Sequence, residues 1–310
     1  MLNFIFTDIY DEEHSVYPVS VTVNMDENVP ADDLFATFHH FTSSQLKSLS
    51  VYDENGVLFT GIVDEQTTQS NSDGEYLKIS ARSMAALLLD NESVPISYNS
   101  PSVRVIEERH LKPFGVKVSE SLSDTYFGTH TVLKGESNYK AVDSFANKLY
   151  SNSVRVDEKG ELSFLGAKKN KSVVFSNSFD GISYYDFCEN IKRCEEISKV
   201  RIKLSNSSGY HSVVENQDAI KRGVVRERYL NCVLTDTPAS YAQSMINNGS
   251  KKSYSVTLYC EGQHLNVFGC NATIKGSVCG DIENLYVSSI RYALSDKKEV
   301  TVITLKRKEV

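Results

Sequence analysis

The chain has 310 residues, of which 40% are hydrophobic and 24% charged, and its formal net charge is −7. That length is sufficient for two or more packed units, because single hydrophobic cores stop growing at roughly 250–300 residues. No segment approaches the ~18 uninterrupted apolar residues of a membrane span, and the acidic N-terminus, MLNFIFTDIYDEEH, lacks the basic region of a signal peptide. We therefore expect the chain to be made and kept in a cytoplasm unless another system carries it out.

The charge is distributed unevenly along the chain. Residues 1–90 hold three basic and fifteen acidic residues, which gives −12, whereas the remaining residues hold thirty basic and twenty-five acidic ones, which gives +5. An acidic first segment argues against nucleic-acid binding through it, because phosphate neutralisation requires Lys and Arg. The acidic surplus indicates either an ordinary solvated surface or a surface that repels a polyanion or meets a basic partner.

Residues 1–90 are predicted to be mostly β-strand. Apolar residues alternate with polar ones in the period of two that strands have, at positions 4–6, 16–23, 34–41, 46–52, 57–63 and 76–81. Pro18 indicates an edge or the start of a strand, and Asn55-Gly56 predicts a tight hairpin turn. A polar loop is expected at 69–74. From Ser83 the apolar spacing changes to three and four, which predicts a short helix. Five or six strands are enough for a small barrel or sandwich.

Residues 91–170 have a different pattern, which predicts a compact α/β insert. A linker with Pro95 and Pro101 leads to a helix over 102–111. A second helix is expected over 139–150, with Ser137 or Asn138 as its N-cap. A hairpin with arms at 154–156 and 162–165 follows.

Residues 171–310 return to strands, expected at 173–175, 182–187, 197–204, 226–230, 256–259, 272–275, 285–293 and 299–306. One helix is predicted over 239–248, capped by Asp236 or Thr237 and ended by Gly249. The last two strands form a closing hairpin with its turn near 295–298. The predicted fold class is α+β and β-rich, with two small barrel-like units separated by the α/β insert.

Six cysteines lie in the second half of the chain, and four residues there have the side chains that zinc prefers: Cys260, His264, Cys270 and Cys279. No pair has the Cys-x-x-Cys spacing of a zinc knuckle, so buried, reduced thiols are the favoured interpretation. Cys188 and Cys194 are too far apart along a strand to form a disulfide. We expect no metal and no cofactor.

Catalytic candidates are equally weak. An ordinary structural role is favoured for each group of candidates. His39-His40 should have one ring packed inward and one facing water, and Glu107, Glu108 and His110 should lie on a solvated helix face. Asp64-Glu65 and Asp11-Glu12-Glu13 should lie in turns or on opposite sides of extended chain, and Tyr184-Tyr185 beside Asp186 should be core or interface residues, with stacking on a sugar as the alternative. There is no phosphate-binding loop, nucleophile elbow or metalloprotease helix. We expect no catalytic residues and no enzyme.

Three separated motifs occur in an order that resembles one known family. The first is Gly61-Ile62-Val63-Asp64, followed by a strand ending in Ala81-Arg82 and an apolar helix ending in Asp90. The second is the hairpin Val154-Arg155-Val156 with Gly160 and Leu162, and the third is the closing hairpin with Tyr286-Val287, Arg291 and 301–305. Together they resemble the central hub protein of the baseplates of contractile phage tails and phage-tail-like bacteriocins, in its Mu-like and prophage forms.

The resemblance implies two barrels related to the tail-tube protein, at 1–90 and 171–310, with the insert at 91–170. It further implies a homotrimer that adapts the six-fold tail tube to the three-fold spike, with the tube protein, the central spike protein and other baseplate proteins as partners. Sequence-specific nucleic-acid binding is not implied, and the acidic residues of 1–90 could line the channel. The alternative function is a carbohydrate-binding or cell-wall-acting tail protein, although the chain has no Trp and no hydrolase motif.

Overall fold

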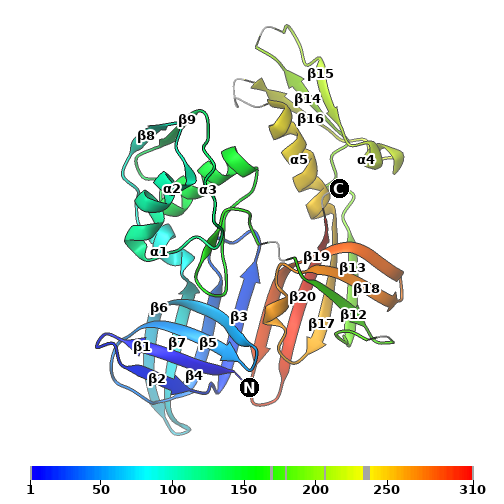
Figure 1. The fold of residues 1–310 in the computed structure, drawn as a ribbon. Coiled ribbons are helices and arrows are strands. Elements are labelled where there is room, and N and C mark those ends of the chain that lie inside the picture. The colour runs from blue at the N-terminus through cyan, green and yellow to red at the C-terminus, as the bar shows by residue number, and fades with distance from the viewer. Residues whose placement is uncertain (1, 168–169, 179, 206, 233–237, 309–310) are drawn as a thin grey trace. The chain divides into compact units, whose positions relative to one another are not determined.

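The computed structural model describes residues 2–167, 170–178, 180–205, 207–232 and 238–308. Figure 1 shows its strands and helices, which divide into two compact units. Unit 1 comprises Met1–Lys171, Cys260–Cys270 and Ser288–Val302, and unit 2 comprises Ser172–Tyr259, Asn271–Val287 and Ile303–Val310. The chain is β-rich with few helices, as its sequence predicts.

Seven strands of unit 1 form an antiparallel sheet in the order β3-β4-β7-β6-β5-β1-β2. Their bounds are β1 Asn3–Asp8, β2 Glu13–Val16, β3 Ser20–Asp26, β4 Asp33–His39, β5 Leu46–Asp53, β6 Gly56–Asn71 and β7 Gly74–Ser83. Alternate residues of β1, β3 and β4 are buried, because side chains in a strand point to opposite faces in turn. Within this unit, β3 also pairs with residues 289–294 of β19.

The observed strands correct two details of the first ninety residues. The predicted strand over 16–23 is interrupted at Pro18, so that β2 and β3 are separate strands. The polar loop predicted at 69–74 is shorter, because β6 continues to Asn71 and pairs with β7 as far as Gly74. The strand over 34–41 is confirmed as β4, and Gly56 has a φ of 137° in the predicted hairpin turn.

The α-helices of unit 1, α1 to α3, lie together beside one end of its sheet (Figure 1). The remaining elements are α1 Ala85–Asp90, β8 Ile96–Asn99, α2 Val103–Ile106, the π-helix η1 Glu107–Leu111, the 3₁₀-helices η2 Lys112–Phe114 and η4 Leu265–Val267, β9 Thr129–Val132, α3 Asn138–Tyr150, β10 Arg155–Val156 and β11 Leu162–Ser163. Ser137 caps α3, because its hydroxyl accepts the N–H of Lys140. The helix predicted over 102–111 is α-helical only to Ile106 and continues as a π-helix.

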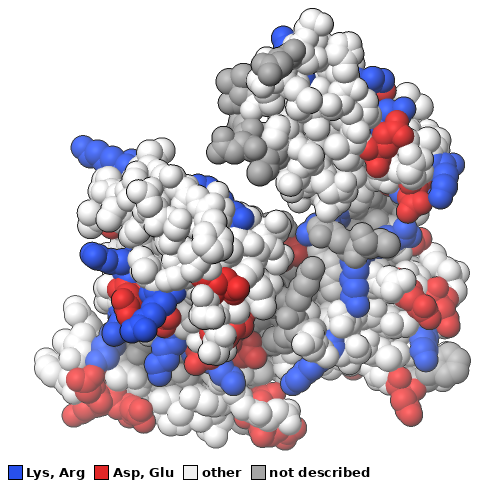
Figure 2. All heavy atoms as spheres, turned by 45° about the horizontal axis from the view of Figure 1, so that its top comes forward, with Lys and Arg blue, Asp and Glu red and all other residues white. Residues whose placement is uncertain are grey.

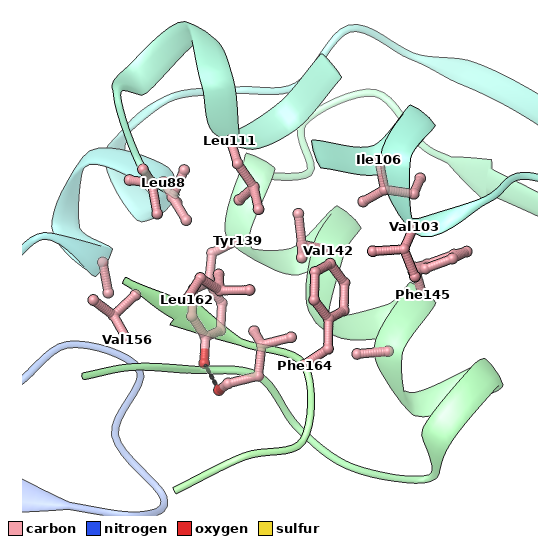
Figure 3. Close-up of a cluster of buried hydrophobic side chains, with 14 of the residues drawn as sticks. Leu88, Val103, Ile106, Leu111, Tyr139, Val142, Phe145, Val156, Leu162 and Phe164 are labelled. Atoms are coloured by element: carbon pink, nitrogen blue, oxygen red, sulfur yellow. Dashed lines mark hydrogen bonds between the residues drawn. The ribbon is translucent and has the colours of Figure 1, made fainter. Parts of the chain in front are cut away.

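A hydrophobic core fills the space between α1, α2, α3 and the β10–β11 hairpin (Figure 3). Leu88, Leu111, Phe145 and Phe164 point into it and are fully buried. At its edge, the hydroxyl of Tyr139 donates to the carbonyl of Val154 at 2.9 Å. The helical spacing of apolar residues in 139–150 therefore marks the face that packs into this core.

The described residues of unit 2 form two groups of strands and the helices α4 and α5. Its elements are β12 Ser172–Ser176, β13 Asp186–Ile191, β14 Lys199–Lys203, β15 Ser212–Glu215, α4 Gln217–Lys221, β16 Glu227–Asn231, α5 Pro238–Ser253 and β18 Asn271–Ser277, with parts of β17 Tyr254–Glu261, β19 Gly280–Leu294 and β20 Glu299–Arg307. β13 pairs with β17, and β18 pairs with β12 and β19. The small sheet β15-β14-β16 packs on α5 around Val200, Ile202, Leu230 and Ile246.

Two predictions in this part of the chain are corrected. The helix predicted over 239–248 runs from Pro238 to Ser253, so that Gly249 lies inside α5 and does not end it. The suggested caps Asp236 and Thr237 lie outside the described residues. The strand predicted over 182–187 begins only at Asp186, while Ile182 makes an isolated bridge to Phe175.

Candidate functional site

Two carboxylates of the first motif bind the guanidinium group of a third residue, Arg82. Arg82 donates from Nε to Asp64 Oδ2 at 2.6 Å and from Nη2 to Asp64 Oδ1 at 2.9 Å. The same side chain donates to both carboxylate oxygens of Asp90, at 3.2 and 2.7 Å. Hydrogen bonds from Arg82 lower the pKa of Asp90. Arg82 therefore fastens the end of β7 to β6 and to the end of α1, which explains the spacing of this motif.

The glycine of the same motif has a separate structural role. A Cβ added to Gly61 would lie 2.2 Å from the backbone oxygen of Arg82, so only glycine allows the two strands to approach this closely. Two residues later the β6–β7 register slips, and Asp64 has no residue opposite it on β7. A bulge at Asp64 thus accompanies its contact with Arg82.

A second arginine, Arg155 of β10, is buried in unit 1 and holds distant parts of the chain together. Its guanidinium pairs with the carboxylate of Asp32 and donates to the carbonyl oxygens of Asp26 and Val29 at 2.7 and 2.8 Å. The ring of Phe268 lies 4.8 Å from its guanidinium carbon. Burial raises the pKa of Asp32 to about 6, and the charge of Arg155 opposes that rise.

Sequence reasoning did not identify this role of Arg155, although the residue lies inside the second motif. A basic residue between two apolar ones in a strand predicts a side chain that faces solvent. The sequence offers one indication that Arg155 is buried. Its charge lies between apolar residues of a hairpin that follows an apolar helix.

A cavity of about 230 Å³ adjoins this buried pair. Asp32, Arg155, Glu120, Asp157 and Glu158 contribute the charged part of its lining. Burial raises the pKa of Asp157. Asp157 also accepts the backbone N–H groups of Lys159 and Glu161, both at 2.9 Å, which is the arrangement of a turn that its own carboxylate stabilises.

The prediction that Glu107, Glu108 and His110 lie on a solvated helix face is wrong for His110, which is buried. Its Nδ1 lies 2.9 Å from Asn138 Oδ1, and its Nε2 lies 3.1 Å from the hydroxyl of Tyr98. A second histidine, His130, is fully buried, and neither of its ring nitrogens has a hydrogen-bond partner among the described residues. Burial lowers the pKa of both histidines, that of His130 to about 4.

The cysteine and histidine residues weighed for zinc do not lie together. Cys260, His264 and Cys270 belong to unit 1, and His264 Nε2 lies 2.9 Å from the carbonyl oxygen of Glu261. Cys279 belongs to unit 2, where its thiol lies 3.4 Å from a carboxylate oxygen of Glu189. In the described part of the chain, the one group spaced to hold a metal ion is Asp8, Glu12 and His14.

The other candidates have ordinary surroundings. His39 is exposed and stacks on the ring of Tyr76 at 5.5 Å, and His40 is half-buried. Tyr184 and Tyr185 contact different rings, those of Phe187 and Tyr259. Figure 2 shows acidic and basic side chains in separate and mixed groups on one face, with uncharged areas between them. No described helix is long and apolar enough to span a membrane.

The sequence matches no protein-family model and no curated protein, whereas solved structures match along the whole chain. The tail protein from Neisseria meningitidis is 14% identical with a TM-score of 0.75, over 99% of this chain and 96% of that one. The 43 kDa tail protein of prophage MuSo2 from Shewanella oneidensis is 14% identical with a TM-score of 0.76, over 98% of each chain. The E. coli c3393 protein is a type VI secretion component described as structurally similar to the T4 tail proteins gp27 and gp5. It is 8% identical with a TM-score of 0.57, over 95% of this chain and 74% of that one.

These matches define the class of the protein by its fold. The chain has the fold of phage tail proteins, over its full described length. The resemblance inferred from three separated motifs is confirmed at this level.

Proposed function

We propose that this chain is the structural hub of a contractile-tail baseplate, in which three copies form a ring that adapts a six-fold tail tube to a three-fold spike. The observation that carries this proposal is the fold similarity, over 98–99% of the chain, to two tail proteins, one of them from a prophage. The described likeness of the c3393 protein, a type VI secretion component, to T4 tail proteins supports a structural role in a tail. The tail-tube protein, the central spike protein and other baseplate proteins are the proposed partners.

In this proposal, residues 1–90 and 171–310 each provide a barrel-like module related to the tube protein, and residues 91–170 form the insert between them. Three chains then present six similar modules to the tube. Because this role is mechanical, it requires large contact areas and no catalysed reaction. The chain would be assembled in the cytoplasm of a bacterial host and then reside in the tail of a phage, prophage or bacteriocin particle.

Mass in solution combined with negative-stain imaging tests the proposal. The expected result is a species of three chains that appears as a three-fold ring with a central hole. A protein that stays monomeric at every concentration, alone and mixed with its tube and spike partners, would contradict it. Binding on a glycan array or clearing of cell wall in a zymogram would favour the alternative, a carbohydrate-binding or cell-wall-acting tail protein.

A further inference from the structure

A cavity of about 470 Å³ in unit 2 has an unbalanced charge. Its lining comes from the end of β13, from α4 and α5, and from the C-terminal end of β20. Five basic residues contribute to it: Arg193, Arg222, Lys251, Arg307 and Lys308. Three acidic residues do so: Glu196, Glu215 and Asp218. Basic groups therefore outnumber acidic ones in its wall.

Each acidic residue of this wall already has a cationic partner. Glu196 pairs with Arg222, Glu215 with Lys199 at 2.8 Å, and Asp218 with Lys221 at 3.6 Å. Two of these partners, Lys199 and Lys221, do not line the cavity. Two of the three carboxylates in the cavity wall are thus neutralised by lysines that lie outside the wall. The basic residues of the wall itself are therefore in excess.

Two guanidinium groups of the wall have no carboxylate partner among the residues that the structure describes. Arg193 donates to the backbone oxygen of Arg222 at 2.8 Å, and Arg307 lies over the ring of Tyr254 at 4.1 Å. Both are exposed. Beside them are the side chains of Ile191, which is 62% exposed, and of Ile246. The cavity therefore combines apolar surface with two guanidinium groups, a combination that suits an acidic segment carrying an apolar side chain.

The β1–β2 turn of unit 1 is such a segment. Ile9 and Tyr10 are 49% and 71% exposed, and Asp11, Glu12 and Glu13, which directly follow in the sequence, are exposed as well. The turn is held in one conformation, because the buried carboxylate of Asp8 accepts the N–H groups of Tyr10 at 2.8 Å and Glu12 at 3.0 Å. A preorganised turn loses little conformational entropy on binding.

We propose that the β1–β2 turn of one copy, residues 9–13, docks into the Arg193–Arg307 cavity of a second copy. The charges of the chain support this choice of occupant, because residues 1–90 carry −12 and the rest of the chain carries +5. The turn and the cavity are different surfaces of the same polypeptide, so the contact is head-to-tail, and such contacts close into rings when the rotation allows. This inference rests on the proposed ring and specifies what holds its subunits together.

Charge reversal on both sides of the contact tests the proposal, with the full chain and analytical ultracentrifugation. Arg193→Glu with Arg307→Glu is expected to weaken self-association roughly tenfold or more. Glu12→Arg with Glu13→Arg should weaken it similarly, and both of these residues are exposed. The chain that carries all four substitutions should regain most of the association, because the charges are exchanged and not removed.

The matched control is Lys203→Glu with Lys275→Glu, which reverses the same number of charges in unit 2 outside the cavity. It is expected to leave association unchanged, and circular dichroism checks that every variant folds. A wild-type ring that all reversed variants retain would overturn the docking but leave the hub proposal intact. Conversely, a wild-type dimer or open chain that only the turn and cavity variants dissociate would support the docking and contradict the three-fold ring. A strictly monomeric wild type would overturn both.

Discussion

The guanidinium of Arg82 makes a two-point contact with the carboxylate of Asp64, eighteen residues earlier in the chain, with donor–acceptor distances of 2.6 and 2.9 Å. It also binds Asp90 at the end of α1. Arg82 is 33% exposed and Asp64 is 26% exposed, so the pair is partly shielded from solvent. Its planar geometry distinguishes it from an ordinary surface ion pair, because both charge-assisted hydrogen bonds form at once.

Replacement of Arg82 by Lys should therefore destabilise the protein, although the charge is kept. We expect a loss of about 1–2 kcal/mol in the free energy of unfolding, measured with urea, because an ammonium group cannot hold two carboxylates in this geometry. Arg104→Lys is the matched control, since Arg104 is 80% exposed and pairs with Glu108 one turn away. It should change stability by less than about 0.5 kcal/mol. Equal effects of the two substitutions would show that the Arg82 contact stabilises the fold no more than an ordinary surface ion pair.

Arg155→Met is expected to destabilise the protein by about 3–5 kcal/mol, because it leaves the carboxylate of Asp32 buried without a partner. The loss should be smaller at pH 5 than at pH 8. The pKa of Asp32 is already raised to about 6, and without Arg155 it rises further, so that at pH 5 the carboxyl group becomes neutral in the folded state.

The second variant in this experiment is Asp32→Asn combined with Arg155→Met. It removes the buried charge and should recover part of the stability at pH 8. If the double variant is no more stable than Arg155→Met, the cost comes from the carbonyl oxygens of Asp26 and Val29 and not from Asp32.

Acid should weaken unit 1 through its buried histidines. Burial lowers the pKa of His130 to about 4 in the folded state, with Lys148 adding to the effect, whereas an unfolded histidine has a pKa of about 6.5. Between these values the unfolded state binds more protons, so stability decreases as the pH falls from about 6.5 to about 4. The same direction holds for His110.

His130→Phe should flatten this dependence and raise stability at pH 5, because it removes two buried nitrogens for which the described residues provide no hydrogen-bond partner. On the order of 2–3 kcal/mol of the acid-induced loss belongs to His130. Thermal unfolding measured from pH 4 to pH 8 checks the prediction, with the exposed His39→Phe as control. An unchanged slope for His130→Phe would contradict the assignment.

Gly249→Ala should destabilise α5, even though alanine is the better helix former by roughly 1 kcal/mol. A Cβ at this position would lie 2.8 Å from the carbonyl oxygen of Glu195 and 3.3 Å from Ile197. We expect a net loss of about 1–2 kcal/mol from the resulting displacement of α5. Asn248→Ala, one residue earlier and exposed, should instead stabilise the helix slightly. Stabilisation by both substitutions would show that the helix moves away at little cost.

The sequence by itself determined the elements whose signals are local. The alternation in β4, the Ser137 cap of α3 and the glycine in the β5–β6 turn each depend on neighbours within a few residues. The order of three motifs was also sufficient to indicate a tail-protein fold, and residues of the first motif contact one another in the structure. Gly61, Asp64 and Arg82 are such a set.

Other features were decided only by tertiary structure, because they depend on residues far apart in the chain. Arg155 is buried since Asp32, more than a hundred residues earlier, supplies its counter-charge. His110 is inside because a π-helical turn replaces the expected α-helix and presents its ring to Asn138 and Tyr98. Local propensity predicts that Gly249 ends α5, but the helix continues through it. The backbone of Glu195 occupies the space that a side chain at position 249 would need, so the glycine serves close packing. In each case the free energy of a long-range contact outweighs the local conformational preference of the sequence.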